Sequence, residues 1–596
     1  MPPREAGQGS RPFRSDLQET PARIQYVRGI GTLGKNPTVG IAFVKIKSII
    51  NLGNMLEELW YKNAVIYSLD LETFMDGNND GTGDFEGLCN RLDYLHALGL
   101  DTIWLAPFQP TPNRDNGYDI SDFYGVDPRH GSSGDFVDFI HKARKLGIKV
   151  IIDLVVNHTS DEHRWFKESR SSKDDPKRDW YVWSDKRPKG WNKGMVFPGV
   201  QKATWTRDKQ SGAYYFHRFY EFQPDLNTDN PEVRAEINRI MGYWLELGIA
   251  GFRVDAVPFI LESPAPDGKQ SPLHFEYLKE MRRFLQWRRG DAVLLGEANV
   301  LPDESKQYFG DEGDGIHLMF NFFVNQYTFY ALATADTRPL IRALEATREK
   351  SPGSQWAFFL RNHDELDLGR LTPEERQVVF DRFGPEKHMQ LYDRGIRRRL
   401  SPMLGNRQQT ELAYSLMFSF PGTPVIRYGD EIGMGDNLDL KERDAVRTPM
   451  QWTAEMQGGF SKAKKLINPV IEDGYYAYEH VNVERQRRDA NSLLNWMTTL
   501  IRLRKECPEI GYGDWEIMET GYPEILGMRY SWKSRVLMIW HNFSEKSLEL
   551  VVPERQAGTG RLIDLMNNIE SVLDHKGRHT ITLEAYGYRW FRARLE

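Results

Sequence analysis

Cysteine is nearly absent from this sequence: among 596 residues, only Cys89 and Cys507 carry thiols. Two thiols cannot form a disulfide framework or a cysteine-ligated metal site, so we expect a reducing, cytoplasmic location. No stretch of 18 uninterrupted apolar residues occurs, and we therefore expect no membrane-spanning helix. Charge of one sign is not in excess, because 78 basic residues face 84 acidic ones. This balance does not favour nucleic acid as a partner.

Regular patterning is also missing from the start of the chain. Residues 1–58 are polar with scattered prolines, and we expect them to form a mobile N-terminal extension. The apolar run at 39–53 is interrupted by lysines and is too short for a convincing signal-peptide core. Patterned sequence begins near residue 59.

From residue 64 onward the chain contains a regular alternation of strand-like and helix-like segments. Short apolar runs predict strands at 64–71, 101–107, 149–158, 251–257, 292–299, 316–323, 355–364 and 423–431. Segments with helical spacing separate them, at 85–99, 132–147, 231–248, 274–289, 338–350 and 409–420. Such alternation indicates an α/β fold with a parallel sheet, and eight units indicate a closed (β/α)8 TIM barrel.

Two further domains are predicted around this barrel. Residues 159–222 separate the third strand from its helix, and a segment of that length implies an inserted domain that forms a lid. Beyond residue 505, short alternating runs indicate an antiparallel β-sandwich over 505–596. The barrel then comprises residues 59–158 and 223–504.

Polar side chains follow four of the predicted strands. In chain order they are Asp153, Asn157 and His158, then Arg253 and Asp255, then Glu297, and finally His363 and Asp364. Barrel active sites lie at the carboxyl ends of the strands, so we expect these residues to share one rim. Two carboxylates on one rim suggest glycoside chemistry, in which one attacks or stabilises and the other donates a proton.

The run GIAGFRVDAV at 248–257 carries an arginine and an aspartate two residues apart. In a strand, Arg253 and Asp255 point to the same face, where they form either a structural salt bridge or a charged nucleophile with its support. We expect the arginine to lower the pKa of Asp255 and keep it ionised. Glu297 has no basic neighbour in sequence and is the candidate for the protonated acid. The separation of the two carboxylates, which distinguishes retention from inversion, is not encoded in the spacing.

The run DGNNDGTGD at 76–84 spaces oxygen donors as a hard cation prefers. Ca²⁺ could use the side chains of Asp76, Asn78, Asp80 and Asp84 with the carbonyl of Thr82. The run is not an EF-hand, because its twelfth position is Gly87 rather than a bidentate glutamate. We expect a structural Ca²⁺ here; the alternative is a plain turn rich in glycine, asparagine and aspartate.

In their order and spacing, the runs DLVVNH, GFRVDAV, GEAN and RNHDE resemble the signature regions of the α-amylase family of glycoside hydrolases. The resemblance covers residues 60 to about 590 and implies retention of configuration. It implies Asp255 as nucleophile, Glu297 as general acid/base and Asp364 as a third carboxylate that binds ring hydroxyls. It also implies a glucose subsite that contains His158, Arg253 and His363. The run at 76–84 resembles a calcium loop of the same family.

Finer features resemble the branch that includes oligo-1,6-glucosidases and trehalose synthases, and the latter most of all. QPDLN at 223–227 is typical of that branch. The run at 116–128 implies Tyr118 and Asp119 at the non-reducing end of the sugar, and the run at 443–452 implies Arg447 as the partner of Asp119. Such a pair would close the pocket and make the enzyme exo-acting; the alternative is a surface salt bridge.

The resemblance implies interconversion of maltose and trehalose through a covalent glucosyl-enzyme, with small α-glucosides as substrates and no organic cofactor. An α-glucosidase, or a transglucosylase with another acceptor, is the alternative. Two departures keep it open, because Gly369 and Arg370 stand where a typical trehalose synthase has a glutamate, and the run at 317–326 also differs. Both segments would border the acceptor. The sequence leaves open whether the chain is a monomer or a homo-oligomer.

Overall fold

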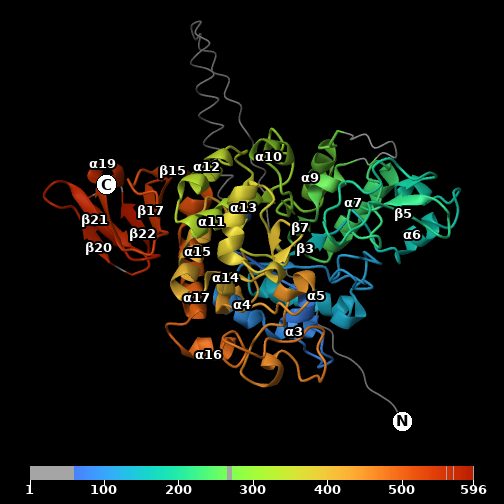
Figure 1. The fold of residues 1–596 in the computed structure, drawn as a ribbon, viewed down its shortest axis with the longest axis horizontal. Coiled ribbons are helices and arrows are strands. Elements are labelled where there is room, and N and C mark those ends of the chain that lie inside the picture. The colour runs from blue at the N-terminus through green and yellow to red at the C-terminus, as the bar shows by residue number, and fades with distance from the viewer. Residues whose placement is uncertain (1–58, 263, 265–271, 559, 568, 595–596) are drawn as a thin grey trace, which may run out of the picture. The chain divides into compact units, whose positions relative to one another are not determined.

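The structure is a computed structural model, and it describes residues 59–262, 264, 272–558, 560–567 and 569–594. The predicted N-terminal extension, residues 1–58, lies outside the described residues. Figure 1 shows the barrel in the middle of the ribbon, with one smaller region that contains β-strands on either side of it.

Eight parallel strands close into a barrel, as the sequence predicts. In chain order they are β1 (Ile66–Leu69), β2 (Thr102–Leu105), β3 (Lys149–Leu154), β7 (Gly251–Val254), β8 (Val293–Gly296), β9 (Leu318–Phe320), β10 (Gln355–Phe359) and β14 (Thr423–Arg427). Each pairs with its neighbours around the ring, and β1 closes on β14 through Ile66 and Val425. Every strand stops before its predicted end, so the polar residues that follow lie in loops at the rim.

The barrel interior is filled by alternate strand residues. Val293 and Leu295 on β8, Leu318 on β9 and Ala357 and Phe359 on β10 belong to one buried cluster. Residues two apart on a strand face the same side, which explains this spacing. The lumen is therefore a packed core, and we expect a ligand to bind above it, at the rim.

Helices cover the outside of the barrel. The predicted helices form as α3 (Phe85–Asn90), α4 (Leu92–Leu98), α5 (Ser133–Lys145), α7 (Pro231–Glu246), α9 (Glu276–Arg288), α12 (Arg338–Ala346) and α15 (Arg407–Ser419). The single helix predicted at 85–99 divides at Arg91 into α3 and α4. A capping box between Ser132 and Asp135 starts α5, as its Ser/Asp signal predicts. None of the helices in the described ranges is long and apolar enough to span a membrane.

The helices that the sequence pattern does not predict include α11 (Phe322–Thr334), α13 (Pro373–Phe383) and α17 (Leu493–Glu506). The predicted sixth strand, 316–323, ends at Phe320 because the side chain of Asn321 caps α11 by accepting from the Val324 amide. The last two residues of that prediction therefore belong to a helix.

Two small sheets stand over the rim. The segment after β3 contains α6 (Arg164–Ser169) and the sheet β4 (Trp183–Ser184), β6 (Tyr214–Phe216) and β5 (Trp205–Arg207). The segment after β10 contains the sheet β11 (Leu366–Asp367), β13 (Gly395–Ile396) and β12 (Gln390–Leu391), which the sequence pattern does not predict. Both segments supply residues to the pocket described below.

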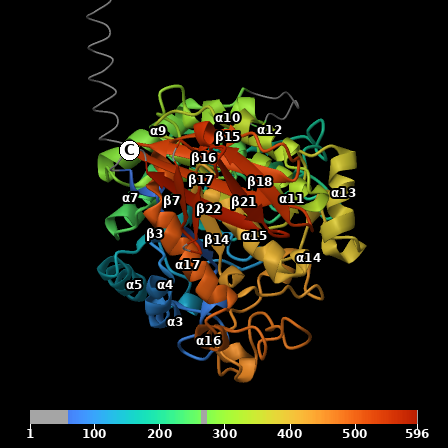
Figure 2. The same cartoon turned by 90° about the vertical axis from the view of Figure 1, so that its left-hand side faces the viewer.

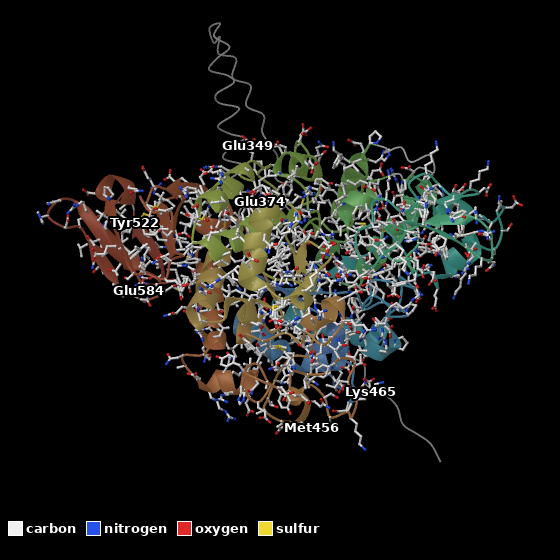
Figure 3. The ribbon with its side chains drawn as sticks, viewed as in Figure 1. Glu349, Glu374, Met456, Lys465, Tyr522 and Glu584 are labelled. Carbon is white, nitrogen blue, oxygen red and sulfur yellow. The ribbon has the colours of Figure 1, made fainter. Side chains whose placement is uncertain are left out.

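The C-terminal region is antiparallel, as the sequence predicts, and Figure 2 shows its sheet from the outside. One sheet contains β15 (Asp514–Met518), β16 (Ile525–Trp532), β17 (Arg535–Asn542), β22 (Tyr588–Arg594), β19 (Arg561–Asp564) and β20 (Glu570–Val572), and a second pairs β18 (Leu548–Pro553) with β21 (Arg578–Leu583). Met538, Leu550 and Ile581 pack between the two sheets. Two exposed hydrophobic side chains, Met456 of the barrel domain and Tyr522 of the C-terminal region, are labelled in Figure 3.

Candidate active site

The two expected catalytic carboxylates occupy equivalent places on adjacent strands. Asp255 directly follows β7, and Glu297 directly follows β8. Between β7 and the short helix α8 (Val257–Ile260), Ala256 adopts a left-handed conformation with φ of 49°. A non-glycine residue holds such a conformation at a cost of about 1–3 kcal/mol, typically at functional sites. The turn directs the Ala256 amide at Glu297 Oε2, over 3.1 Å.

Arg253 connects three carboxylates. Its guanidinium is 1% exposed, and Nη1 lies 2.6 Å from Asp153 and 2.5 Å from Asp255 Oδ1. Nη2 lies 2.7 Å from Glu297 Oε2. The pair in the run GFRVDAV is therefore part of a larger network, because Arg253 fixes both expected catalytic carboxylates at one buried point.

Burial changes the expected charge state of Asp255. Burial raises the pKa of Asp255 to about 6, and the Arg253 guanidinium offsets only part of that rise. The prediction that arginine would lower the pKa of Asp255 is therefore wrong in net direction, since desolvation of the carboxylate exceeds the attraction. With a pKa of about 6, Asp255 is still mainly ionised at neutral pH, as a nucleophile requires.

The pKa values of Glu297 and Asp364 are shifted in opposite directions. Burial, together with the negative charges of Asp255 and Asp364, raises the pKa of Glu297. Arg253 contacts Glu297 in space, which its sequence neighbours do not reveal, but the net direction still favours a protonated acid. Burial acts against ionisation of Asp364 too, yet the charges of His363, Arg443 and Arg447 bring its pKa well below the usual value.

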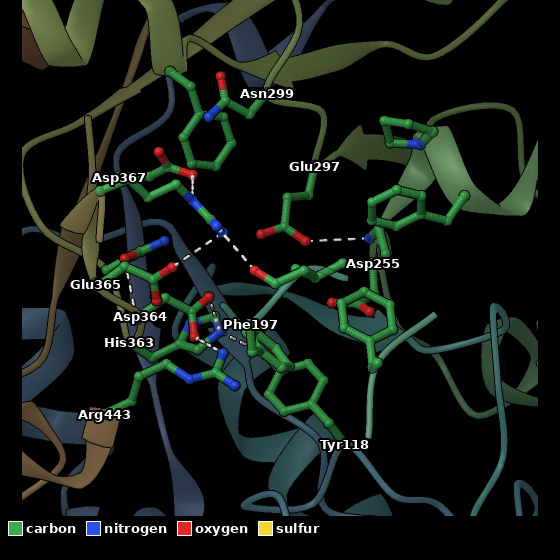
Figure 4. Close-up of a pocket in the computed structure, with 18 of the residues that line it drawn as sticks. Tyr118, Phe197, Asp255, Glu297, Asn299, His363, Asp364, Glu365, Asp367 and Arg443 are labelled. Carbon is green, nitrogen blue, oxygen red and sulfur yellow. Dashed lines mark hydrogen bonds and ion pairs between the residues drawn. The ribbon is translucent and has the colours of Figure 1, made fainter. Parts of the chain in front are cut away.

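These residues surround a pocket of about 310 Å³ above the barrel (Figure 4). It is lined by Asp115, Tyr118, His158, Val196, Phe197, Phe219, Asp255, Ala256, Pro258, Phe259, Glu297, Asn299, Val300, Phe322, Asn362, His363, Asp364, Glu365, Asp367, Arg370, Arg394 and Arg443. In Figure 4, Asp255 and Glu297 point into this space from one side and Asp364 and Glu365 from the other.

Three of the residues expected to bind substrate line the donor side of the pocket, the side where we expect the transferred sugar to bind. The Tyr118 hydroxyl lies 2.9 Å from His363 Nε2, and the two rings stack at 5.5 Å. His158 Nε2 lies 3.1 Å from the Tyr118 carbonyl oxygen, and burial lowers the pKa of His158 to about 4. His158 is therefore neutral near pH 7 and suited to hydrogen bonding with a hydroxyl.

The predicted pairing of Asp119 with Arg447 is wrong. Asp119 is fully buried outside the pocket lining and pairs with Arg114 at 3.5 Å. Arg447 donates to the His363 carbonyl at 2.8 Å and to Asp364 Oδ1 at 3.1 Å, so it orients the third carboxylate.

The cation and carboxylate that do meet in the pocket are Asp115 and Arg443. They lie 3.4 Å apart, and Arg443 Nη1 also lies 2.5 Å from Asp364 Oδ1. Each precedes by four residues the position that the sequence suggested. The sequence did contain a signal, because both residues are polar and lie beside the motifs that we used. It did not show which polar residue of each loop enters the pocket, since the conformation of the loop decides that.

Sequence reasoning also missed the aromatic residues that cover the site. Phe197 and Phe219 come from the segment after β3, and Phe219 packs edge-on against His158 with 5.2 Å between the rings. Arg443 lies over the Phe197 ring at 5.0 Å. The inserted segment therefore reaches the donor side, in the position of a cover over the pocket.

The loop at 76–84 is held by its own backbone. Asp76 accepts from the amides of Asn79 and Gly81, Asp80 accepts from the Thr82 amide, and Asp84 caps α3 by accepting from the Gly87 amide. In the described part of the chain, no three acidic, histidine or cysteine side chains gather as metal ligands. The donor types suit Ca²⁺, but these contacts do not gather them round a point, and the calcium site stays a prediction.

A closed (β/α)8 barrel with paired carboxylates at its carboxyl rim defines the protein as a carbohydrate-active barrel enzyme. Comparison with known families agrees. The α-amylase catalytic domain matches residues 68–381 and 393–513, and the C-terminal domain of sucrose hydrolase-like proteins matches residues 534–592. The chain belongs to the α-amylase family.

Its relatives include trehalose synthases. That of Pimelobacter sp. (strain R48) is 40% identical over 551 residues, which cover 90% of this chain and 96% of that protein. That of Thermus thermophilus is 41% identical over 541 residues, which cover 90% of this chain but only 56% of that longer protein. The solved trehalulose synthase MutB from Pseudomonas mesoacidophila MX-45 matches with a TM-score of 0.71 and 26% identity, over 89% of this chain and 99% of that one.

Proposed function

We propose that this enzyme isomerises maltose and trehalose by transferring a glucosyl group within one active-site complex. The observation that carries the proposal is the shared attachment of Asp255 and Glu297 to Arg253 in one pocket, which Asp115 and Arg443 also line. One guanidinium therefore holds both an ionised carboxylate and a carboxyl whose pKa is raised, the two kinds of group that double-displacement glycosyl transfer uses. Trehalose synthases at about 40% identity support the choice of substrates.

In the first step, the Asp255 carboxylate attacks the anomeric carbon of the non-reducing glucose of maltose. Glu297 gives its proton to the glycosidic oxygen as that carbon–oxygen bond breaks, so a glucosyl ester and a free glucose remain. Arg253 holds both groups, and its charge stabilises Asp255 as the leaving carboxylate of the second step.

In the second step, the glucose turns within the pocket and presents its anomeric hydroxyl. Glu297, now a carboxylate, accepts that proton while the oxygen attacks the glucosyl carbon and the ester bond to Asp255 breaks. Trehalose leaves, and both side chains return to their starting states. Two displacements at one carbon retain its configuration.

Exclusion of water decides between transfer and hydrolysis. Asp115 and Arg443 bound the donor end, and Phe197 and Phe219 add apolar cover from the inserted segment. A glucose that stays bound competes with water through its high effective concentration. An α-glucosidase or another transglucosylase would share the first step but would not keep the released glucose bound.

We also propose a structural Ca²⁺ at 76–84 and a cytoplasmic location. The loop concentrates the carboxylates of Asp76, Asp80 and Asp84 within nine residues, and carboxylate oxygens are the ligands that Ca²⁺ prefers. The location rests on the two cysteines of the sequence.

The proposed isomerisation is tested by incubating the purified protein with maltose and resolving the products over time. Trehalose as the main product, with little free glucose, is the expected result. Free glucose without trehalose would reject the isomerase and leave an α-glucosidase.

A further inference from the structure

Arg394 joins several parts of the pocket wall. It directly precedes β13, whose Gly395 pairs with Asp367 on β11. This antiparallel register brings the guanidinium to Asp367, with Nε 3.2 Å from Oδ2, and to Glu365, with Nη2 3.7 Å from Oε1. The three side chains are 23%, 19% and 7% exposed, respectively. Arg394 is therefore oriented by two acids that themselves line the pocket.

The third contact of Arg394 reaches across to the inserted segment. Nη1 donates to the carbonyl of Val196 over 2.9 Å. The next residue, Phe197, packs against the rings of Tyr220 and Tyr392, each with centroids 4.8 Å away. One arginine thus links the barrel loop after β10 to the residue that positions an aromatic cover of the pocket.

Gly369 explains why this link fits. A Cβ atom added there would lie 3.2 Å from Cδ of Arg394 and 2.9 Å from Oδ1 of Asp367. The Gly369 amide itself donates to Asp367 Oδ1 over 2.7 Å. A longer side chain, such as the glutamate expected from the resemblance, would meet the arginine. The absence of a side chain at Gly369 therefore leaves the space in which Arg394 and Asp367 pair.

We propose that Arg394 is a positioning residue that latches the 196–197 segment over the pocket, with Asp367 and Gly369 as its seat. By holding this segment closed, the latch sets how the glucosyl-enzyme divides between the retained glucose and water. The effect on the glucosyl-enzyme rests on the proposed function, and the latch itself does not. A conformational cover of this kind governs water exclusion without touching the reacting atoms.

The first experiment measures closure directly. Lys193 is exposed and lies just before the latched segment, so trypsin cleavage after Lys193 reports how often the segment opens. We expect cleavage to accelerate about threefold or more in Arg394→Met, and to be intermediate in Arg394→Lys, which keeps the charge but not the forked geometry. Gly369→Glu should accelerate it as well, by displacing the guanidinium.

Arg289→Met is the matched control. Arg289 also bonds an acid, Asp291 at 2.9 Å, and a backbone carbonyl, that of Ile249 at 2.7 Å, and its side chain is 24% exposed. It lies before β8, at the opposite end of the barrel from the pocket. Wild-type cleavage after Lys193 is expected in this variant. Unchanged cleavage in Arg394→Met would overturn the latch.

The second experiment measures the ratio of glucose to trehalose formed from maltose. This ratio compares two fates of one intermediate and is independent of how fast the intermediate forms. We expect it to rise about threefold or more in Arg394→Met and to stay at the wild-type value in Arg289→Met. Faster cleavage with an unchanged ratio would overturn the role in partition. If the wild-type protein makes no trehalose, the proposed isomerisation fails, and the cleavage experiment alone decides the latch.

Discussion

Arg253 donates from Nη1 to Asp255 Oδ1 over 2.5 Å, in a position where both side chains are buried. The same guanidinium contacts Glu297, so one cation serves both the proposed nucleophile and the proposed acid. Burial raises the pKa of both carboxyls, and the arginine prevents that rise from neutralising Asp255 at neutral pH. This arrangement leads to the predictions below.

Removal of the nucleophile should abolish turnover but not folding. In Asp255→Ala, kcat on maltose should fall by about 10⁴-fold or more, because no carboxylate remains to form the ester. Thermal unfolding should stay within a few degrees of wild type. Added azide should enter the vacated space and restore glucosyl transfer, with β-glucosyl azide as the product. Retention of more than about 1% of wild-type activity without azide would mean that another residue attacks.

Glu297 should matter most when the leaving group is poor. In Glu297→Gln the glycosidic oxygen of maltose receives no proton, and kcat should fall by about 10³-fold. The glucosylation step with α-glucosyl fluoride, whose leaving group needs no proton, should lose far less. Equal losses for both donors, measured by pre-steady-state release of the leaving group, would argue against Glu297 as the acid.

Activity should fall on the acidic side as Asp255 becomes protonated. Its pKa is raised to about 6, so kcat/KM should decline as the pH drops through about 6. Asp153 is a nearby negative charge that contributes to this raised pKa, so Asp153→Asn should move the acidic limb to lower pH. The pKa of Glu297 is raised as well, by burial and by neighbouring negative charges, and deprotonation of Glu297 should produce a second, basic limb. An acidic limb that does not move in Asp153→Asn would contradict the assignment.

The donor end should be closed by Asp115 and Arg443. With maltopentaose, the wild-type enzyme should remove single glucose units from the non-reducing end, because we expect this pair, 3.4 Å apart, to block a further sugar. Asp115→Gly should open that end and allow maltose to be released as well, as resolved by chromatography. Maltose release by the wild-type enzyme would show that the pair closes nothing.

The calcium prediction is tested by removing the metal. If the loop at 76–84 binds Ca²⁺ in the folded state, a chelator should lower Tm by about 5 °C or more, and added Ca²⁺ should reverse the change. Asp80→Asn should show a smaller response. Elemental analysis that finds no calcium in the purified protein, with an unchanged Tm, would make the loop a plain turn.

The barrel was predictable because its strands are buried on both faces and therefore appear as short continuous apolar runs. Even the short β9 follows from its apolar residues. Its end does not, because the switch from strand to helix depends on the local cap that Asn321 supplies to α11. The helix α13 also escaped prediction, since only Val379, Phe380 and Phe383 of its residues are buried.

The position of Asp255 and Glu297 at the rim was predictable because each directly follows a strand, whose direction places it there. Asp115 and Arg443 were not, because they lie 328 positions apart on loops whose conformation sets the register. The net pKa shift of Asp255 was also beyond the sequence. It depends on how much water the surrounding side chains exclude, and Phe197 and Phe219 reach the pocket only in the folded chain.

The most direct test of the account is maltose conversion in the presence of excess ¹³C-labelled glucose, with the products analysed by mass spectrometry. If the released glucose stays in the pocket until it is glucosylated again, the trehalose formed should be almost free of label. Trehalose that carries the label of the medium would show that the glucose leaves, and free glucose as the sole product would show that water takes its place. Either result would contradict isomerisation within one closed pocket.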